Sequence, residues 1–145
     1  MQNLFKQTET LLGGPGKLPV RLHHRADYLR MTNIGLSKEN FDSLRRQTGL
    51  DVKTASAVLS LTPRTIQRFG KKEKFRKPAS EKLLRLADLY ARGYSLFGTK
   101  EKFQEWISSP NMALENQTPI SLLDNHYGLD MIESLIGRME YGIYS

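Results

Sequence analysis

The sequence predicts an all-α protein, and three observations support this class. Apolar residues recur at intervals of three and four from Ser37 onward, which is the spacing of amphipathic helices. Ser, Thr or Thr-Pro stands where several of these patterns begin, and Gly often stands where they end. No stretch alternates apolar and polar residues as a half-buried strand would, and no internal repeat is present. With 145 residues, the chain suits one domain or two very small ones.

The composition permits a modest core and excludes several classes of protein. Apolar residues make up 39% of the chain and charged residues 26%, which is not the composition of a disordered protein. The absence of cysteine excludes disulfides and thiol catalysis and fits a reducing compartment. No run of 18 apolar residues is present, and the first residues lack the pattern of a secretory signal. We therefore expect a cytoplasmic protein that does not enter the membrane.

The positive charge is concentrated in the first part of the chain. Residues 1–80 hold 16 Lys and Arg against 6 Asp and Glu, a net charge of +10. Residues 81–145 hold 6 against 9, a net charge of −3. This asymmetry indicates two tasks, of which the first is contact with a polyanion.

Residues 1–34 are expected to form a flexible or variable N-terminal segment. The stretch GGPGKLP has a density of Gly and Pro that breaks regular structure, so residues 1–20 are interpreted as a flexible lead-in. Residues 20–33 could form a helix or a strand. His23 and His24 are adjacent and would diverge on a helix, and neither cysteines nor an acidic cluster supply further metal ligands. We expect an ordinary surface role for both and no metal site.

Residues 35–79 are expected to form the first domain, built from short helices. Ser37 can cap a helix that Gly49 ends, and a second helix is expected from about Asp51 to Leu59. A third is expected from Pro63 to Phe69, since Thr62 can cap it and proline suits the first helical position.

The last two of these helices are separated by three residues and form a candidate helix-turn-helix. Such a motif needs apolar residues that meet in one small core and a small residue where the helices cross. Ser56 is the small residue, and Ser60 stands in the turn where Gly is common. The apolar positions are occupied by Ala55, Leu59, Leu61, Ile66 and Phe69.

The third helix and the segment after it match the chemistry of DNA recognition. Arg side chains pair with guanine and Gln with adenine in the major groove, while hydroxyls and cations bond to phosphates. The predicted DNA-binding residues are Thr62, Arg64, Thr65, Gln67, Arg68, Lys71, Lys72 and Lys74. A basic strip, residues 71–77, holds five cations and one acid and would grip the DNA backbone. The alternative is a helical hairpin with a solvated charged face.

Residues 80–145 are expected to form a second, helical domain without a catalytic site. Ser80 can cap a long helix over residues 81–97, and Thr99 can cap the next one. Thr118-Pro119 is expected to start a helix that Gly128 ends, and a last helix runs to Gly142. We find no arrangement typical of a nucleophile with its base, and no Gly-rich phosphate loop. The protein is therefore not expected to be an enzyme or to need a cofactor.

The chain ends in Tyr-Gly-Ile-Tyr-Ser, residues 141–145, which places two aromatic residues and an aliphatic one at a terminus. A frayed terminus gains little from such residues, so they either pack on their own domain or enter a pocket of a partner.

From about Gly35 onward, several short motifs follow one another along roughly three quarters of the chain. In order they are Gly35-Leu36-Ser37, LTPRTIQR at 61–68, SEKLLRLA at 80–87, Phe97-Gly98, Trp106-Ile107, Pro110-Asn111, Leu114, Thr118-Pro119, Leu122-Leu123, Gly128 and LIGRMEYG at 135–142. In the order and spacing of these motifs, the sequence resembles the antitoxins of the Xre/MbcA/ParS family, in which an Xre-like helix-turn-helix precedes a toxin-binding domain. The sequence departs from the family where Asn116 and Gln117 replace glycines and where FGKKEKF replaces an Arg-rich run.

The resemblance implies an antitoxin of a type II toxin–antitoxin system. Members of the family neutralise a RES-domain toxin that degrades NAD or transfers ADP-ribose, and they are homodimers that repress their own promoter. It also implies that the last residues of the chain cover the toxin's active site. The implied toxin-binding residues are Arg138, Tyr141, Gly142, Ile143, Tyr144 and Ser145. The alternative is a free-standing helix-turn-helix regulator whose C-terminal domain dimerises or senses a ligand.

Overall fold

The computed structural model describes residues 2–142, and within them every regular element is a helix. The α-helices are α1 (Gln2–Leu11), α2 (Ala26–Ile34), α3 (Lys38–Thr48), α4 (Val52–Val58), α5 (Pro63–Gln67), α6 (Lys77–Phe97), α7 (Lys100–Ile107) and α8 (His126–Glu140). Three short 3-10 helices are η1 (Pro15–Lys17), η2 (Met112–Leu114) and η3 (Pro119–Leu122). The expected all-α class is confirmed.

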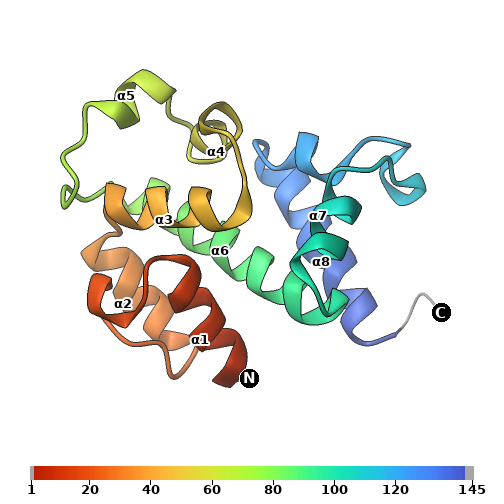
Figure 1. Cartoon of the computed structure of the whole chain (residues 1–145), viewed down its shortest axis with the longest axis horizontal. Helices are drawn as coiled ribbons and strands as arrows, with labels where there is room; N and C mark the ends of the chain where they lie inside the picture. The colour runs from red at the N-terminus through yellow and green to blue at the C-terminus, as the bar shows by residue number, and fades with distance from the viewer. Residues whose placement is uncertain (1, 143–145) are drawn as a thin grey trace. The chain divides into compact units, whose positions relative to one another are not determined.

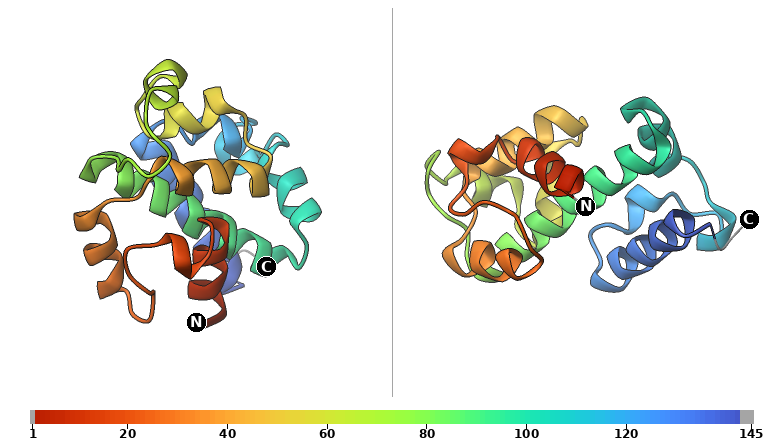
Figure 2. Two further views of the ribbon diagram at one scale, coloured as in Figure 1. Left: turned by 60° about the vertical axis from the view of Figure 1, so that its left-hand side comes forward. Right: turned by 90° about the horizontal axis from the view of Figure 1, so that it is seen from below.

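The chain folds into two compact units, the first ending at Ala91 and the second beginning at Arg92. Helix α6 belongs to both, since it begins in the first unit and ends in the second. Figures 1 and 2 show the helices of each unit, with longer loops after α5 and after α7.

The N-terminal segment differs from the flexible lead-in that the sequence suggested. Helix α1 buries Phe5 and Leu11, and Leu12 just after it is fully buried. The glycines and prolines that suggested flexibility are confined to residues 13–19, and the residues before them have an apolar helical face. Side chains of α3 fix the end of α1: Ser43 Oγ donates to the Leu11 carbonyl at 3.1 Å, and Gln47 Nε2 donates to the Thr10 carbonyl at 2.7 Å.

Buried carboxylates hold the connection between α1 and α2. Glu9, which is 2% exposed, accepts the backbone N–H of Leu22 at 2.7 Å. Asp27 accepts the backbone N–H groups of His23 and His24 at 2.7 and 2.8 Å. These hydrogen bonds lower the pKa of Asp27 to about 2, because they stabilise its charged form. A charged group of this kind contributes to the stability of the first unit at neutral pH.

Helix α3 begins as the sequence predicted. Ser37 Oγ accepts the N–H of Asn40 at 3.3 Å, and Asn40 Oδ1 accepts the N–H of Ser37 at 2.9 Å, which completes a capping box. The helix ends at Gly49, whose φ of 75° is in the left-handed region.

Helix α6 begins earlier than predicted, and Ser80 is not its N-cap. The helix starts at Lys77, because Pro78 fits its first turn. Ser80 is fully buried, and its hydroxyl accepts the N–H of Leu36 at 2.9 Å and donates to the Phe75 carbonyl at 3.3 Å. The residue therefore ties three segments together instead of capping a helix.

Aromatic packing forms the core of the second unit. Phe103 is fully buried, and its ring lies 5.6–5.9 Å from the rings of Tyr94, Phe97 and Trp106. Trp106, which was expected in the core, is only half-buried. Helix α7 starts as predicted, with the Thr99 hydroxyl accepting the N–H of Lys102 at 3.2 Å.

Gly128 does not end a helix, as the sequence suggested, but lies in the first turn of α8. A Cβ added there would lie 2.2 Å from the Leu122 carbonyl oxygen, so the glycine allows η3 to pack directly on α8. Asn125 caps α8 by accepting the N–H groups of Tyr127 and Gly128. Thr118 starts only the 3-10 helix η3 and makes no capping hydrogen bond with its side chain.

Candidate nucleic-acid interface and a surface on the second unit

Helices α4 and α5 and the turn between them form the helix-turn-helix. Ala55, Leu59 and Ile66 are 1–3% exposed and meet in its core, and Ser56 is fully buried where a small residue was expected. Leu61 and Phe69, expected in the same core, are half-buried. The predicted apolar positions therefore face inward, as the motif requires.

The turn places Ser60 in a conformation that favours glycine, with a φ of 59°. The N–H groups of Leu59 and Leu61 both donate to the Ser56 carbonyl at 3.0 Å, which closes the turn tightly. Lys82 Nζ donates to Ser60 Oγ at 2.7 Å and ties the turn to α6. The backbone thus explains why Gly is common at this position in related turns.

The start of α5 is fixed by the two threonines that the sequence assigned to DNA. Thr62 Oγ1 accepts the N–H of Thr65 at 3.1 Å, which makes Thr62 the N-cap. Its hydroxyl also donates to Thr65 Oγ1 at 2.9 Å. Both side chains are exposed, and the Thr65 hydroxyl, whose hydrogen is not used in this pair, can donate to an outside acceptor such as a phosphate oxygen.

The other predicted DNA-binding side chains of α5 extend outward. Ile66 anchors the helix in the core, and Arg64, Gln67 and Arg68 are all exposed. Within the described residues, these three make no hydrogen bond or ion pair through their side chains, so their donors are available to a ligand.

The basic strip that follows α5 is a braced loop. The N–H groups of Lys38 and Glu39, at the start of α3, donate to the carbonyls of Glu73 and Lys71 at 3.1 and 2.9 Å. Phe75 is 3% exposed and packs edge-on against Phe41, which anchors the strip in the core. All five cations of the strip are exposed. The backbone of the strip is therefore fixed next to α5, and its cations extend into the solvent.

One carboxylate balances part of this charge. Glu39 Oε1 lies 2.7 Å from Lys17 Nζ and 3.7 Å from Lys71 Nζ. The hydrogen bond from Lys17, together with the charges of Lys71 and Lys72, holds the pKa of Glu39 below its usual value. The carboxylate is thus charged at neutral pH, and among the described residues Lys71 is the one predicted DNA-binding cation of the strip that lies within ion-pair distance of an acid.

The second unit presents the residues that the family resemblance assigned to a protein partner. Arg138 lines a hollow of about 410 Å³, and Tyr141 is 83% exposed just after α8. Gly142, with a φ of 68°, ends the helix. Ile143, Tyr144 and Ser145, which carried the rest of that prediction, lie outside the described residues.

The same hollow contains residues that sequence reasoning missed. Tyr127 and Met131 are 76% and 48% exposed, and both line it together with Arg138 and Leu135. Met112, 88% exposed, lies in η2 next to the lining residues 113 and 114. The sequence contained a signal for this surface, because positions 127, 131, 135 and 138 are spaced three or four residues apart and so share one face of α8.

An ion pair fixes the end of α8, close to Tyr141. Arg92 donates to Glu140 in a bidentate arrangement, with N···O distances of 2.7 and 3.2 Å. Before α8, the loop of residues 111–117 turns through Glu115 and Asn116, which have φ values of 56° and 64°. Asn116, at a position where the resemblance implies glycine, adopts the left-handed conformation that glycine permits.

The sequence predicted neither a metal site nor a membrane-spanning helix. No group of three or more potential metal-ligating residues comes together in the described part of the chain, and His23 and His24 are both exposed there. None of the helices within residues 2–142 combines the length and the apolar character needed to cross a bilayer.

Comparison with known proteins assigns each half of the chain to a domain family. Residues 27–88 match the Xre-like helix-turn-helix domain of antitoxins, and residues 92–142 match the C-terminal toxin-binding domain of Xre/MbcA/ParS antitoxins. The order of these two domains defines a class of protein that joins a helix-turn-helix to a toxin-binding domain.

Two curated relatives agree with this assignment. An "Antitoxin Xre" of Photorhabdus laumondii subsp. laumondii is 35% identical over 80 residues, and the match spans 54% of each chain. An "Antitoxin Xre" of Yersinia enterocolitica is 27% identical over 114 residues, and the match spans 77% of each chain. The chain carries both domains of an Xre/MbcA/ParS-type antitoxin.

Proposed function

We propose that this protein is the antitoxin of a type II toxin–antitoxin system, with separate surfaces for the toxin and for promoter DNA. The observation that carries the proposal is the pair of matched domains in one chain, each of which has its own exposed surface of suitable chemistry. The first unit has the net charge of +10 and the second the net charge of −3 already seen in the sequence.

The geometry of the first unit supports base-specific binding to double-stranded DNA. An α-helix fits the major groove, and α5 directs Arg64, Gln67 and Arg68 away from the core on a helix with a fixed start. The braced cations Lys71, Lys72 and Lys74 lie next to it, where they would neutralise phosphates. The short helix reads the bases and the strip holds the backbone.

A gel-shift or anisotropy assay tests this half of the proposal. Arg64→Ala and Arg68→Ala should each cost about 1–3 kcal/mol in affinity for the promoter and relax specificity at the contacted base. Affinity for random DNA should fall much less. Equal affinity of the parent protein for promoter and random DNA would contradict base reading.

The surface of the second unit supports binding of a protein. Tyr, Met and Arg side chains are enriched at protein–protein interfaces, and exposed side chains of these types gather here around one hollow. We propose that a RES-domain toxin covers this surface and that residues 141–145 enter the toxin's pocket for NAD. A plug of aromatic side chains would exclude the substrate without any chemistry of the antitoxin's own. The protein would act as a homodimer that represses its operon.

Co-expression with the product of the neighbouring gene tests the toxin half. The two proteins should co-purify, and the partner alone should deplete NAD while the complex does not. Deletion of residues 143–145 should weaken protection and leave promoter binding intact. A neighbour that is harmless and does not associate would leave a free-standing regulator as the better explanation.

A further inference from the structure

Beside the helix-turn-helix, the first unit carries a basic surface of which the sequence singled out only the part formed by Lys71, Lys72 and Lys74. Two adjoining hollows of about 350 and 390 Å³ share Lys17 and Glu39 in their lining. We call the lining of both hollows the flanking surface. It contains six cations and two carboxylates, Glu39 and Asp42, which gives it a net charge of +4. The six cations are Lys17, Lys38, Arg46, Lys71, Lys72 and Lys74.

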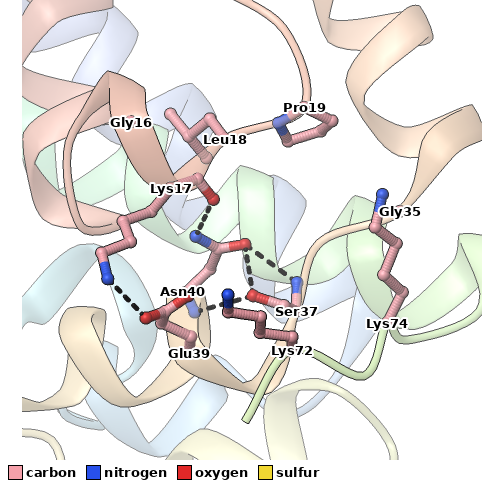
Figure 3. A pocket seen from close by; sticks show the side chains of 10 residues that line it. All are labelled: Gly16, Lys17, Leu18, Pro19, Gly35, Ser37, Glu39, Asn40, Lys72 and Lys74. Carbon is pink, nitrogen blue, oxygen red and sulfur yellow. Dashed lines mark hydrogen bonds and ion pairs between the residues drawn. The ribbon is translucent and has the colours of Figure 1, made fainter.

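The flanking surface is held by buried hydrogen bonds. Asn40 is 1% exposed, and its amide donates to the carbonyls of Leu12 and Lys17 at 2.7 and 3.0 Å. Figure 3 shows Asn40 between the Lys17 carbonyl and Ser37, with Lys72 and Lys74 at the same hollow. The amide thus fixes residues 12–17 on the start of α3, so Lys17 is carried by an ordered turn.

Ion pairs within the flanking surface engage both of its carboxylates but only three of its six cations. Glu39 pairs with Lys17 and Lys71, and Asp42 pairs with Lys38 at 3.4 Å. Lys72, Lys74 and Arg46 have no ion pair within the described residues and are all exposed. The surface therefore keeps a positive potential after its internal pairs have formed.

The flanking surface is continuous with the basic strip. Lys71, Lys72 and Lys74 belong to both, and the ammonium groups of Lys17 and Lys71 converge on the same oxygen of Glu39. None of its lining residues is aromatic, so it lacks the stacking platform that single-stranded nucleic acids need. Cations without aromatic residues fit the backbone of a duplex, where the bases are stacked inside and the phosphates lie outside.

From this geometry we propose that the flanking surface binds the phosphate backbone of duplex DNA outside the bases that α5 reads. The inference rests on the proposed promoter binding and deepens it. The contact adds affinity for any sequence and no specificity, because Lys17 and Arg46 meet phosphates only. Residues 13–17, which precede the matched helix-turn-helix domain, thereby become part of the DNA-binding surface.

Salt dependence of DNA binding tests this inference. The double variant Lys17→Gln/Arg46→Gln removes two cations, which should reduce the slope of log K against log salt by about 1.8. Between 50 and 200 mM salt, its affinity should therefore fall about twelvefold less than that of the parent. The matched control Lys6→Gln/Lys102→Gln removes the same net charge at exposed positions outside the surface and should keep most of the parent slope.

Two further measurements separate this contact from other effects. Promoter and random DNA should lose affinity equally in the double variant, since phosphate contacts are independent of sequence. Glu39→Gln should act in the opposite direction and raise affinity for both, because it frees Lys17 and Lys71. Circular dichroism confirms that each variant is folded before it is compared.

These experiments distinguish failure of the flanking contact from failure of the proposed promoter binding. If the parent does not prefer its promoter over random DNA, base reading by α5 fails. If the parent prefers its promoter but the double variant has the same slope as the control variant, the flanking contact is overturned and the proposed function stands. A loss confined to promoter DNA, or a Glu39→Gln variant that binds DNA more weakly, would also overturn it.

Discussion

The left-handed backbone at Ser60 leads to a quantitative prediction about the helix-turn-helix. An L-residue in this region costs about 1–2 kcal/mol, whereas glycine adopts it without that cost. Glycine also loses more chain entropy on folding, which reduces its advantage in folding free energy by about 0.4–1 kcal/mol. The Ser60→Gly variant should therefore be more stable than Ser60→Ala by about 0.5–1 kcal/mol.

The alanine variant is the proper reference because both substitutions remove the hydrogen bond from Lys82 to Ser60. That bond is exposed, so its loss alone should cost about 0.5 kcal/mol and place Ser60→Ala below the parent. Differential scanning calorimetry should show the first unit of the glycine variant melting roughly 4 °C above that of the alanine variant. An alanine variant as stable as the glycine variant would refute the assigned turn conformation.

The remaining predictions concern packing, pH and the toxin surface. Gly128→Ala should destabilise the second unit by about 1–3 kcal/mol through contact with the Leu122 carbonyl, as followed by fluorescence of Trp106, the one tryptophan of the chain. The control Gly137→Ala would place its Cβ 3.4 Å from Arg92 Nη2, an ordinary contact distance, and should gain up to about 1 kcal/mol; equal effects of the two would contradict the packing. Because the pKa of Asp27 is lowered to about 2, its contribution to stability should be full above about pH 4 and should disappear as the pH falls through 2. Urea titrations from pH 5 to 2 should show a flatter profile for Asp27→Asn, and a profile parallel to the parent's would contradict this. Tyr127→Ser, which exposes no core residue, should weaken the toxin complex by about 1–3 kcal/mol in calorimetry without changing promoter affinity; unchanged toxin affinity would place the contact elsewhere.

Local sequence signals determined where several helices begin and end. Ser37, Thr62 and Thr99 cap their helices as predicted, and Gly49 ends one, because capping depends on residues within a few positions along the chain. The signals misled where a residue had a tertiary partner. Ser80 is engaged by Leu36, and Gly128 is needed by Leu122, and neither partner can be read from the neighbouring sequence.

By itself, then, the sequence determined the helical class, the separation of positive from negative charge, and the outward residues of α5. These follow from composition and from a repeat of three to four residues, which are properties of short stretches of chain. Tertiary structure alone decided that residues 2–34 fold onto α3 and α6, because Asn40 of α3 reaches back to the Leu12 carbonyl and Tyr28 donates to Asp88 of α6. It also placed Lys17 beside Lys71, 54 positions later, where two cations share one carboxylate and extend the basic surface. Charge in a sequence indicates the kind of partner, but only packing sets the outline of the surface that meets it.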